Sequence, residues 1–189
     1  MSEVKSDTSW ISGQARPGIV TIGDPHLKLG SRDVTDLRAV APILDKMVLT
    51  LRELNGAGLA APQLGEPIKA VVIEVRRTDV FPDRPETPLM VMVNPQIVSI
   101  SDATESGWEG CFSVPGIMGV VPRSNQIEVK YLSPAGALHQ EQYDGYVARV
   151  IQHEIDHLSG IEFLNRMTSL DSLTTVQNYL EFHRAKDPD

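Results

Sequence analysis

Cysteine is almost absent from this sequence of 189 residues, in which Cys111 is the single example. One cysteine cannot form an intramolecular disulfide, which excludes a disulfide-stapled secreted scaffold and favours a reducing, cytoplasmic location. The chain also lacks an apolar run of the roughly 18 residues that a membrane span needs, so no membrane contact is expected. Residues 1–17 lack the apolar centre of a signal peptide and carry Glu3 and Asp7, which a transit peptide avoids. We expect them to form a flexible N-terminal arm.

Positive charge is scarce as well. The 17 lysine and arginine residues are outnumbered by 25 aspartate and glutamate residues, which gives a net charge of −8. A surface of that sign repels the phosphates of nucleic acids, so no DNA partner is expected and small or peptide ligands are favoured. Hydrophobic residues make up 41% of the chain, within the globular range, and the length suits one compact domain.

Periodic apolar residues predict three helices. They recur at three- and four-residue spacing from Asp36 to Leu54, although Pro42 within this pattern suggests that the regular helix begins near it. A second helix is expected after Gly145 and up to Ser159-Gly160. Its apolar residues cover more than one face, which is typical of a central helix. A third is expected over residues 171–185.

Between the two long helices the sequence changes to short β-branched segments separated by proline, glycine and aspartate. These segments predict strands at 70–75, 89–93, 96–100, 126–132 and about 138–143. Helices and strands in separate parts of the chain indicate an α+β fold.

The central helix contains the sequence His153-Glu154-Ile155-Asp156-His157. Side chains four residues apart share a helix face, so both imidazoles can bind one metal ion, while Glu154 can reach a water molecule on that ion. The alternative is a pair of ordinary histidines flanking a solvated glutamate. A mostly apolar helix disfavours this alternative, because three buried ionisable groups would need partners.

Two histidines leave a catalytic metal short of its usual third protein ligand. A metzincin would place a histidine where this chain has Phe163, so that class is excluded. A thermolysin-like enzyme would take a glutamate from a later helix, and Glu181 lies at a tolerable spacing. Cys111 is the other candidate, because a thiolate is a good metal ligand and Gly110 beside it permits close backbone approach. A lone cysteine is otherwise a small buried hydrophobic residue.

Small residues dominate a third segment, GAGLAAPQ at 56–63, which suits either a tight turn or a close approach to a ligand. Together with EGCFS at 109–113 and QHEIDH at 152–157, it resembles the three signature motifs of the peptide deformylase family, in the same order. The resemblance extends from about Ile19 to Met167. It implies antiparallel sheets packed around a central metal-binding helix, with an N-terminal and a C-terminal helix.

The resemblance also implies a metal site. Cys111, His153 and His157 would hold one divalent ion, natively iron(II), for which zinc, nickel or cobalt can substitute. The implied activity is removal of the N-formyl group from the N-terminal formylmethionine of new polypeptides, with release of formate. A noncatalytic relative that only binds metal or peptide is the alternative, and a purely structural site would not need Gln63 and Glu154.

Further roles follow from the same resemblance. Glu154 would be the general base and then the general acid, and the Gln63 side chain and the Phe112 backbone N–H would stabilise the oxyanion. Phe112 stands where the family usually has leucine, which affects the pocket shape and not the backbone donor. Gly58 would pair with the backbone of the peptide.

The methionine side chain would lie against Gly110, Val150 and His153, with Arg123 nearer the later residues of the peptide. Residues 18–170 would form the catalytic domain, and 171–189 a C-terminal helix and tail. The net charge of −2 on that tail predicts only weak, transient contact with ribosomes. A monomer is expected, in the cytoplasm or, in a eukaryote, in an organelle.

Overall fold

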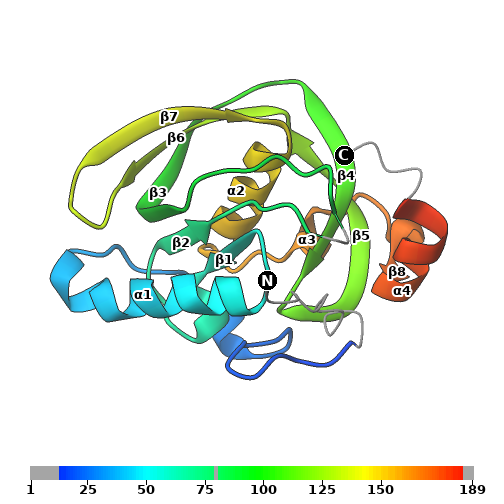
Figure 1. The fold of residues 1–189 in the computed structure, drawn as a ribbon, viewed down its shortest axis with the longest axis horizontal. Coiled ribbons are helices and arrows are strands. Elements are labelled where there is room, and N and C mark those ends of the chain that lie inside the picture. The colour runs from blue at the N-terminus through cyan, green and yellow to red at the C-terminus, as the bar shows by residue number, and fades with distance from the viewer. Residues whose placement is uncertain (1–12, 79–80, 185–189) are drawn as a thin grey trace, which may run out of the picture.

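The computed structural model describes residues 13–78 and 81–184, whose strands form two antiparallel sheets (Figure 1). One sheet has five strands in the order β1-β2-β3-β6-β7, and the other has three in the order β4-β5-β8. This confirms the expected α+β class. The strands are β1 Gly58–Ala60, β2 Ala70–Ile73, β3 Met90–Ile100, β4 Thr104–Cys111, β5 Val114–Ser124, β6 Gln126–Leu132, β7 Leu138–Asp144 and β8 Thr174–Thr175.

The helices include the two long ones that the sequence predicts. The two long helices are α1 Leu37–Glu53 and α2 Gly145–His157, and the short ones are α3 Phe163–Arg166 and α4 Val176–Asn178. Short 3-10 helices lie at Pro25–Lys28, Ala61–Leu64 and Leu170–Ser172, and a π-helical turn lies at Tyr179–His183. Within the described residues no helix is long and apolar enough to cross a membrane. The predicted arm lies outside the described residues as far as residue 12.

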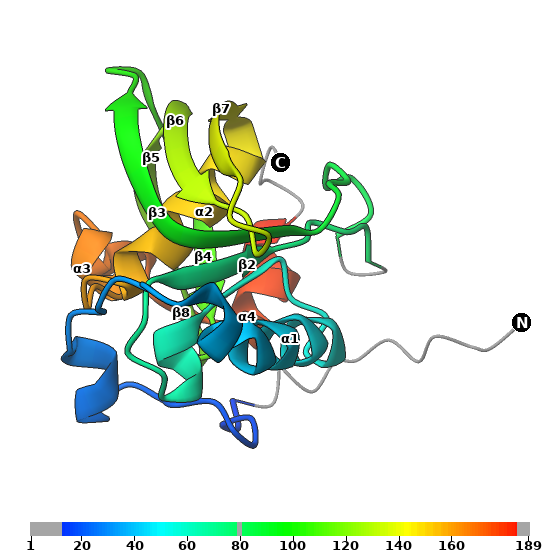
Figure 2. The same ribbon diagram turned by 90° about the vertical axis from the view of Figure 1, so that its left-hand side faces the viewer.

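The five-stranded sheet lies between α1 and α2 (Figure 2). Successive side chains of a strand point to opposite faces. Along β2, Ala70 and Val72 therefore pack with the apolar residues of α1, whereas Val71 and Ile73 pack with those of α2. Both faces of this strand are fully buried, which holds α2 firmly at the centre of the molecule.

The prediction that α1 begins near Pro42 is wrong. The helix begins at Leu37, because the carboxylate of Asp36 accepts hydrogen bonds from the backbone N–H groups of Arg38 and Ala39 at 2.9 and 3.2 Å. This N-cap and the buried apolar stripe outweigh the one intrahelical hydrogen bond that Pro42 cannot donate.

Two strand predictions need correction. Residues 89–93 and 96–100 belong to one strand, β3, whose pairing with β6 shifts in register between Val93 and Gln96. The long hairpin of β4 and β5 was not predicted at all. Its two strands contain several glycines and few regularly alternating apolar side chains, so the period-two signal of a strand is missing.

The C-terminal segment is not the single helix expected over 171–185. A short 3-10 helix ends at Ser172, Thr174 and Thr175 then form β8, which pairs with Met118 and Ile117 of β5, and helical structure resumes only at Val176. The free edge of β5 offers unpaired backbone groups, and β-branched threonines suit a strand, so edge pairing replaces the first helical turns.

Candidate functional site

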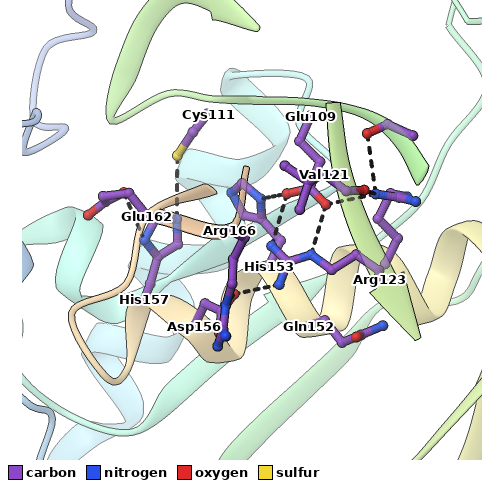
Figure 3. Close-up of polar contacts among 12 residues, drawn as sticks. Glu109, Cys111, Val121, Arg123, Gln152, His153, Asp156, His157, Glu162 and Arg166 are labelled. Carbon is purple, nitrogen blue, oxygen red and sulfur yellow. Dashed lines mark hydrogen bonds and ion pairs between the residues drawn. The ribbon is translucent and has the colours of Figure 1, made fainter. Parts of the chain in front are cut away.

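Helix α2 and the end of β4 bring three candidate metal ligands together (Figure 3). One ligand atom from each of Cys111, His153 and His157 lies within 4.8 Å of the others. Sγ of Cys111 is 3.4 Å from Nε2 of His157. His153 is 8% exposed and His157 is 1% exposed, so the group is held inside the protein.

This is the only such cluster of histidine, cysteine and carboxylate residues within 13–78 and 81–184. Glu181, the third ligand of the thermolysin-like alternative, is exposed on the C-terminal segment and does not belong to it. The structure therefore does not support that alternative.

A buried carboxylate from β4 supports the first histidine. Oε2 of Glu109 is 2.8 Å from Nδ1 of His153, and Glu109 also accepts hydrogen bonds from Arg123 and Arg149. Burial raises the pKa of Glu109, but the hydrogen bonds from His153 and Arg123 outweigh it and hold the pKa well below its usual range. Glu109 is therefore an anion, and it fixes the ring of His153 with Nε2 free to bind a metal.

Arg123 lies elsewhere than the sequence suggested. Its side chain is 6% exposed, and its guanidinium bridges Glu109 to Asp156. Asp156 also accepts hydrogen bonds from Arg166. Arg123 therefore binds the β4–β5 hairpin to α2, and it does not line the cavity beside Cys111 and His153. No motif indicated this ion-pair network, because pairing across strands is not visible in spacing along the chain.

The second histidine faces a carboxylate that the sequence analysis missed. Oε2 of Glu162, just beyond α2, is 3.3 Å from Nδ1 of His157, and both side chains are 1% exposed. Burial raises the pKa of Glu162 and lowers that of His157 well below its usual value. The available signal was a charged residue between the apolar Ile161 and Phe163.

Glu154 lies beside the three candidate ligands and is 5% exposed. Burial raises the pKa of its carboxyl group to about 7, so the group can exchange a proton near neutral pH. A Cβ atom on Gly58 would come within 2.6 Å of Oε1 of Glu154, so only glycine allows β1 to approach this closely. The small residues of the segment 56–63 thus serve a close approach.

Gln63 directs its amide nitrogen at the cysteine. Nε2 is 3.4 Å from Sγ of Cys111 and 3.3 Å from Oγ of Ser113. Its Oε1 accepts a hydrogen bond from the backbone N–H of Ala60 at 2.8 Å, and this bond determines which end of the amide faces the site. The side chain is 1% exposed and so has little freedom to turn away.

A cavity of about 440 Å³ opens onto this group. Its walls include nearly all the residues that the sequence singled out, namely Gly58, Gln63, Gly110, Cys111, Phe112, Val150, His153 and Glu154. Trp108, Met118 and Val176 add apolar surface. Val176 shows that the C-terminal segment forms part of the wall.

The donor set fits a catalytic divalent metal. One thiol and two imidazoles provide three ligands, and the cavity gives access for a fourth. Nδ1 of His157 is buried and faces Oε2 of Glu162 at 3.3 Å, which leaves Nε2, the ring nitrogen nearer Sγ of Cys111, for a metal. Hydrogen bonds to Cys111 and Glu109 overcome the effect of burial and raise the pKa of His153.

Comparison with known proteins agrees with this site. The profile of the polypeptide deformylase family matches residues 17–172. The chain belongs to the peptide deformylase family. It is 36% identical to peptide deformylase 2 of Nostoc sp., over 86% of this chain and 92% of that protein. It is 40% identical to peptide deformylase 1 of Bordetella pertussis, over 80% and 88% of the two chains.

A solved relative has the same fold. The Met-Ala-Ser-bound class I type b peptide deformylase of Acinetobacter baumannii is 37% identical, with a TM-score of 0.76 over 79% of this chain and 96% of that one. Peptide deformylases are metal-dependent hydrolases, and this chain accordingly removes the N-formyl group from nascent peptides. The expectation drawn from the three sequence motifs is confirmed.

Proposed function

We propose that deformylation here uses one divalent metal ion, natively iron(II), held by Cys111, His153 and His157. The observation that carries this proposal is the convergence of these three ligand atoms on the wall of a cavity that also contains Glu154 and Gln63. When bound, such an ion lowers the pKa of a water molecule and polarises the formyl carbonyl. Zinc, nickel or cobalt can replace iron in this role.

Glu154 moves the protons. Its carboxylate accepts a proton from the attacking water and then gives it to the departing amine of methionine. This role of Glu154 is supported by its burial beside the proposed ligands and by a pKa of about 7. At that pKa the carboxyl group can both accept and donate a proton near neutral pH.

Gln63 and Phe112 stabilise the negative charge that develops on the formyl oxygen. The amide Nε2 of Gln63 is already aimed at the metal site, and the backbone N–H of Phe112 follows the cysteine directly. Fixed donors in a site that excludes water are worth more than the same donors in solvent. The Gln63 amide, which the backbone N–H of Ala60 holds in place, does not have to reorganise during the reaction.

The peptide binds along the cavity. Gly58 pairs with its backbone, and the methionine side chain packs against Gly110, Val150 and His153, which share the cavity wall. The relative from Acinetobacter baumannii, bound to Met-Ala-Ser, supports a short N-terminal peptide as ligand. The thioether side chain of the substrate methionine suits the apolar wall of the cavity, because a methionine side chain adapts to irregular surfaces.

The wider setting is proposed on the same basis. A nascent-peptide substrate favours a location in the cytoplasm or, in a eukaryote, in an organelle. The protein is a monomer in this proposal, and its contact with ribosomes is weak and transient. Residues 18–170 form the catalytic domain, between the arm at 1–17 and the tail at 171–189. The family match over 17–172 supports these boundaries.

One assay tests the proposal. Protein loaded anaerobically with iron(II) is given formyl-Met-Ala-Ser, and formate is measured against the products from an internally cleavable peptide. We expect formate release and no internal cleavage. Stoichiometric metal binding without formate release would leave only the noncatalytic alternative, and internal cleavage would indicate a peptidase.

A further inference from the structure

Each imidazole of the proposed metal site directs Nδ1 at a buried carboxylate. Glu109 lies 2.8 Å from His153, and Glu162 lies 3.3 Å from His157 (Figure 3). The side chains of the two glutamates are 4% and 1% exposed. Glu109 comes from β4, whereas Glu162 comes from the segment that follows α2, so unrelated parts of the chain produce the same arrangement twice.

The carboxylate of Glu162 interacts with Lys28 through charge alone and is not occupied by a hydrogen bond from the described residues. Both oxygens lack a hydrogen-bond partner among the described residues, and so does Nδ1 of His157. The nearby Lys28 directs its ammonium group to the carbonyl of Gly160 and to the side chain of Asn165. A buried carboxylate without a partner destabilises a fold. Nδ1 of His157 and the carboxylate of Glu162 face each other at 3.3 Å without other hydrogen-bond partners. This geometry points to a hydrogen bond between them that forms when the ring binds a metal ion.

The orientation of the ring determines which nitrogen holds the proton. Nε2 of His157 faces Sγ of Cys111 at 3.4 Å, so Nε2 is the ligand atom. A neutral ring ligated through Nε2 carries its hydrogen on Nδ1, and that hydrogen then points at Glu162. We propose that Glu162 accepts this hydrogen bond and is a positioning residue for His157, as Glu109 is for His153.

The inference rests on the proposed function and adds a new element to it. A second anion behind the site makes His157 a more basic ligand and holds the ring in its ligating orientation. It also brings more negative charge toward a divalent cation. Loss of such an outer carboxylate weakens metal binding by roughly 10- to 100-fold in known sites, and we expect the same here.

The test compares Glu162→Gln with Glu162→Leu and uses Glu181→Gln, which alters an exposed carboxylate, as the control. Zinc affinity is measured by competition with a chelator, and the unfolding temperature is measured without and with zinc. We expect the dissociation constant to increase in Glu162→Gln, which keeps a neutral acceptor, and to increase further in Glu162→Leu, which removes the acceptor. The control should match wild type.

The metal-free proteins separate positioning from packing. Glu162→Leu removes an unpartnered buried carboxylate, so the metal-free variant should unfold at the same or a higher temperature while it binds zinc more weakly. A packing role would produce the reverse, a lower unfolding temperature with unchanged affinity for zinc, and that result would overturn the proposal.

Proton NMR of the zinc form gives a direct reading. Two imidazole N–H resonances shifted downfield and protected from exchange are expected in wild type, and Glu162→Leu should abolish or displace one of them. Wild-type affinity together with both resonances unchanged would refute the role of Glu162. If wild-type protein itself bound no zinc and released no formate, the proposed function would fail instead.

Discussion

The amide nitrogen of Gln63 is 3.4 Å from Sγ of Cys111, and a bond from the Ala60 backbone holds the amide in that orientation. A donor set in place before substrate binds can stabilise charge that develops in the transition state. We therefore expect Gln63→Leu to lower kcat by roughly 100- to 1000-fold, with little change in KM. Steady-state kinetics with formyl-Met-Ala-Ser measures both. Turnover near that of wild type would remove Gln63 from the mechanism.

Glu154→Gln separates binding from chemistry. The amide keeps the shape of the side chain and loses the ability to carry a proton, so metal content and substrate affinity should stay near wild type while turnover falls by orders of magnitude. Elemental analysis and titration with a nonhydrolysable peptide provide the controls. Retained turnover would assign proton transfer to another group.

The three proposed ligands should behave alike. Cys111→Ser, His153→Ala and His157→Ala are each expected to lose metal and activity, because a catalytic site needs three protein ligands. Glu181→Ala should lose neither, since that side chain is exposed and outside the cluster. Full metal content in Cys111→Ser would contradict the assignment of the thiolate.

Oxygen should inactivate the iron form. An iron(II) ion held by a thiolate presents two oxidisable centres, so activity in aerated buffer should decay quickly, and nickel or cobalt should protect it. The half-lives of the iron and nickel forms in air, measured side by side, test this expectation. Equal values would show that neither centre limits the enzyme's lifetime.

Arg123 should matter for stability more than for substrate binding. Arg123→Met removes the cation between Glu109 and Asp156 and leaves their buried negative charges without it, which should cost about 3 to 5 kcal/mol of unfolding free energy. Denaturant titration measures this loss, and Arg52→Met, which breaks an exposed ion pair with Glu74, is the control. A large rise in KM with unchanged stability would instead place Arg123 at the peptide.

The sequence predicts the parts of this structure that show a regular apolar periodicity or contain a motif of closely spaced functional residues. The spacing of His153 and His157 places both rings on one face of a helix. The apolar stripe of α1 predicted that helix, although its first residue was predicted incorrectly. The β4–β5 hairpin was not predicted, because its strands show no regular alternation of apolar residues and are evident only from their pairing in the folded chain. Glu162 and Arg123 acquire their roles from neighbours that contact them only in the folded chain, and no spacing rule reports such contacts.

The order of the chain has a consequence for biosynthesis. Cys111, His153 and His157 all come from the later part of the sequence, and Val176, which is 3% exposed, completes the cavity wall. A ribosome making this protein therefore exposes the N-terminal end long before the metal-binding residues emerge. The metal site and its cavity therefore exist only after nearly all of the chain has been made.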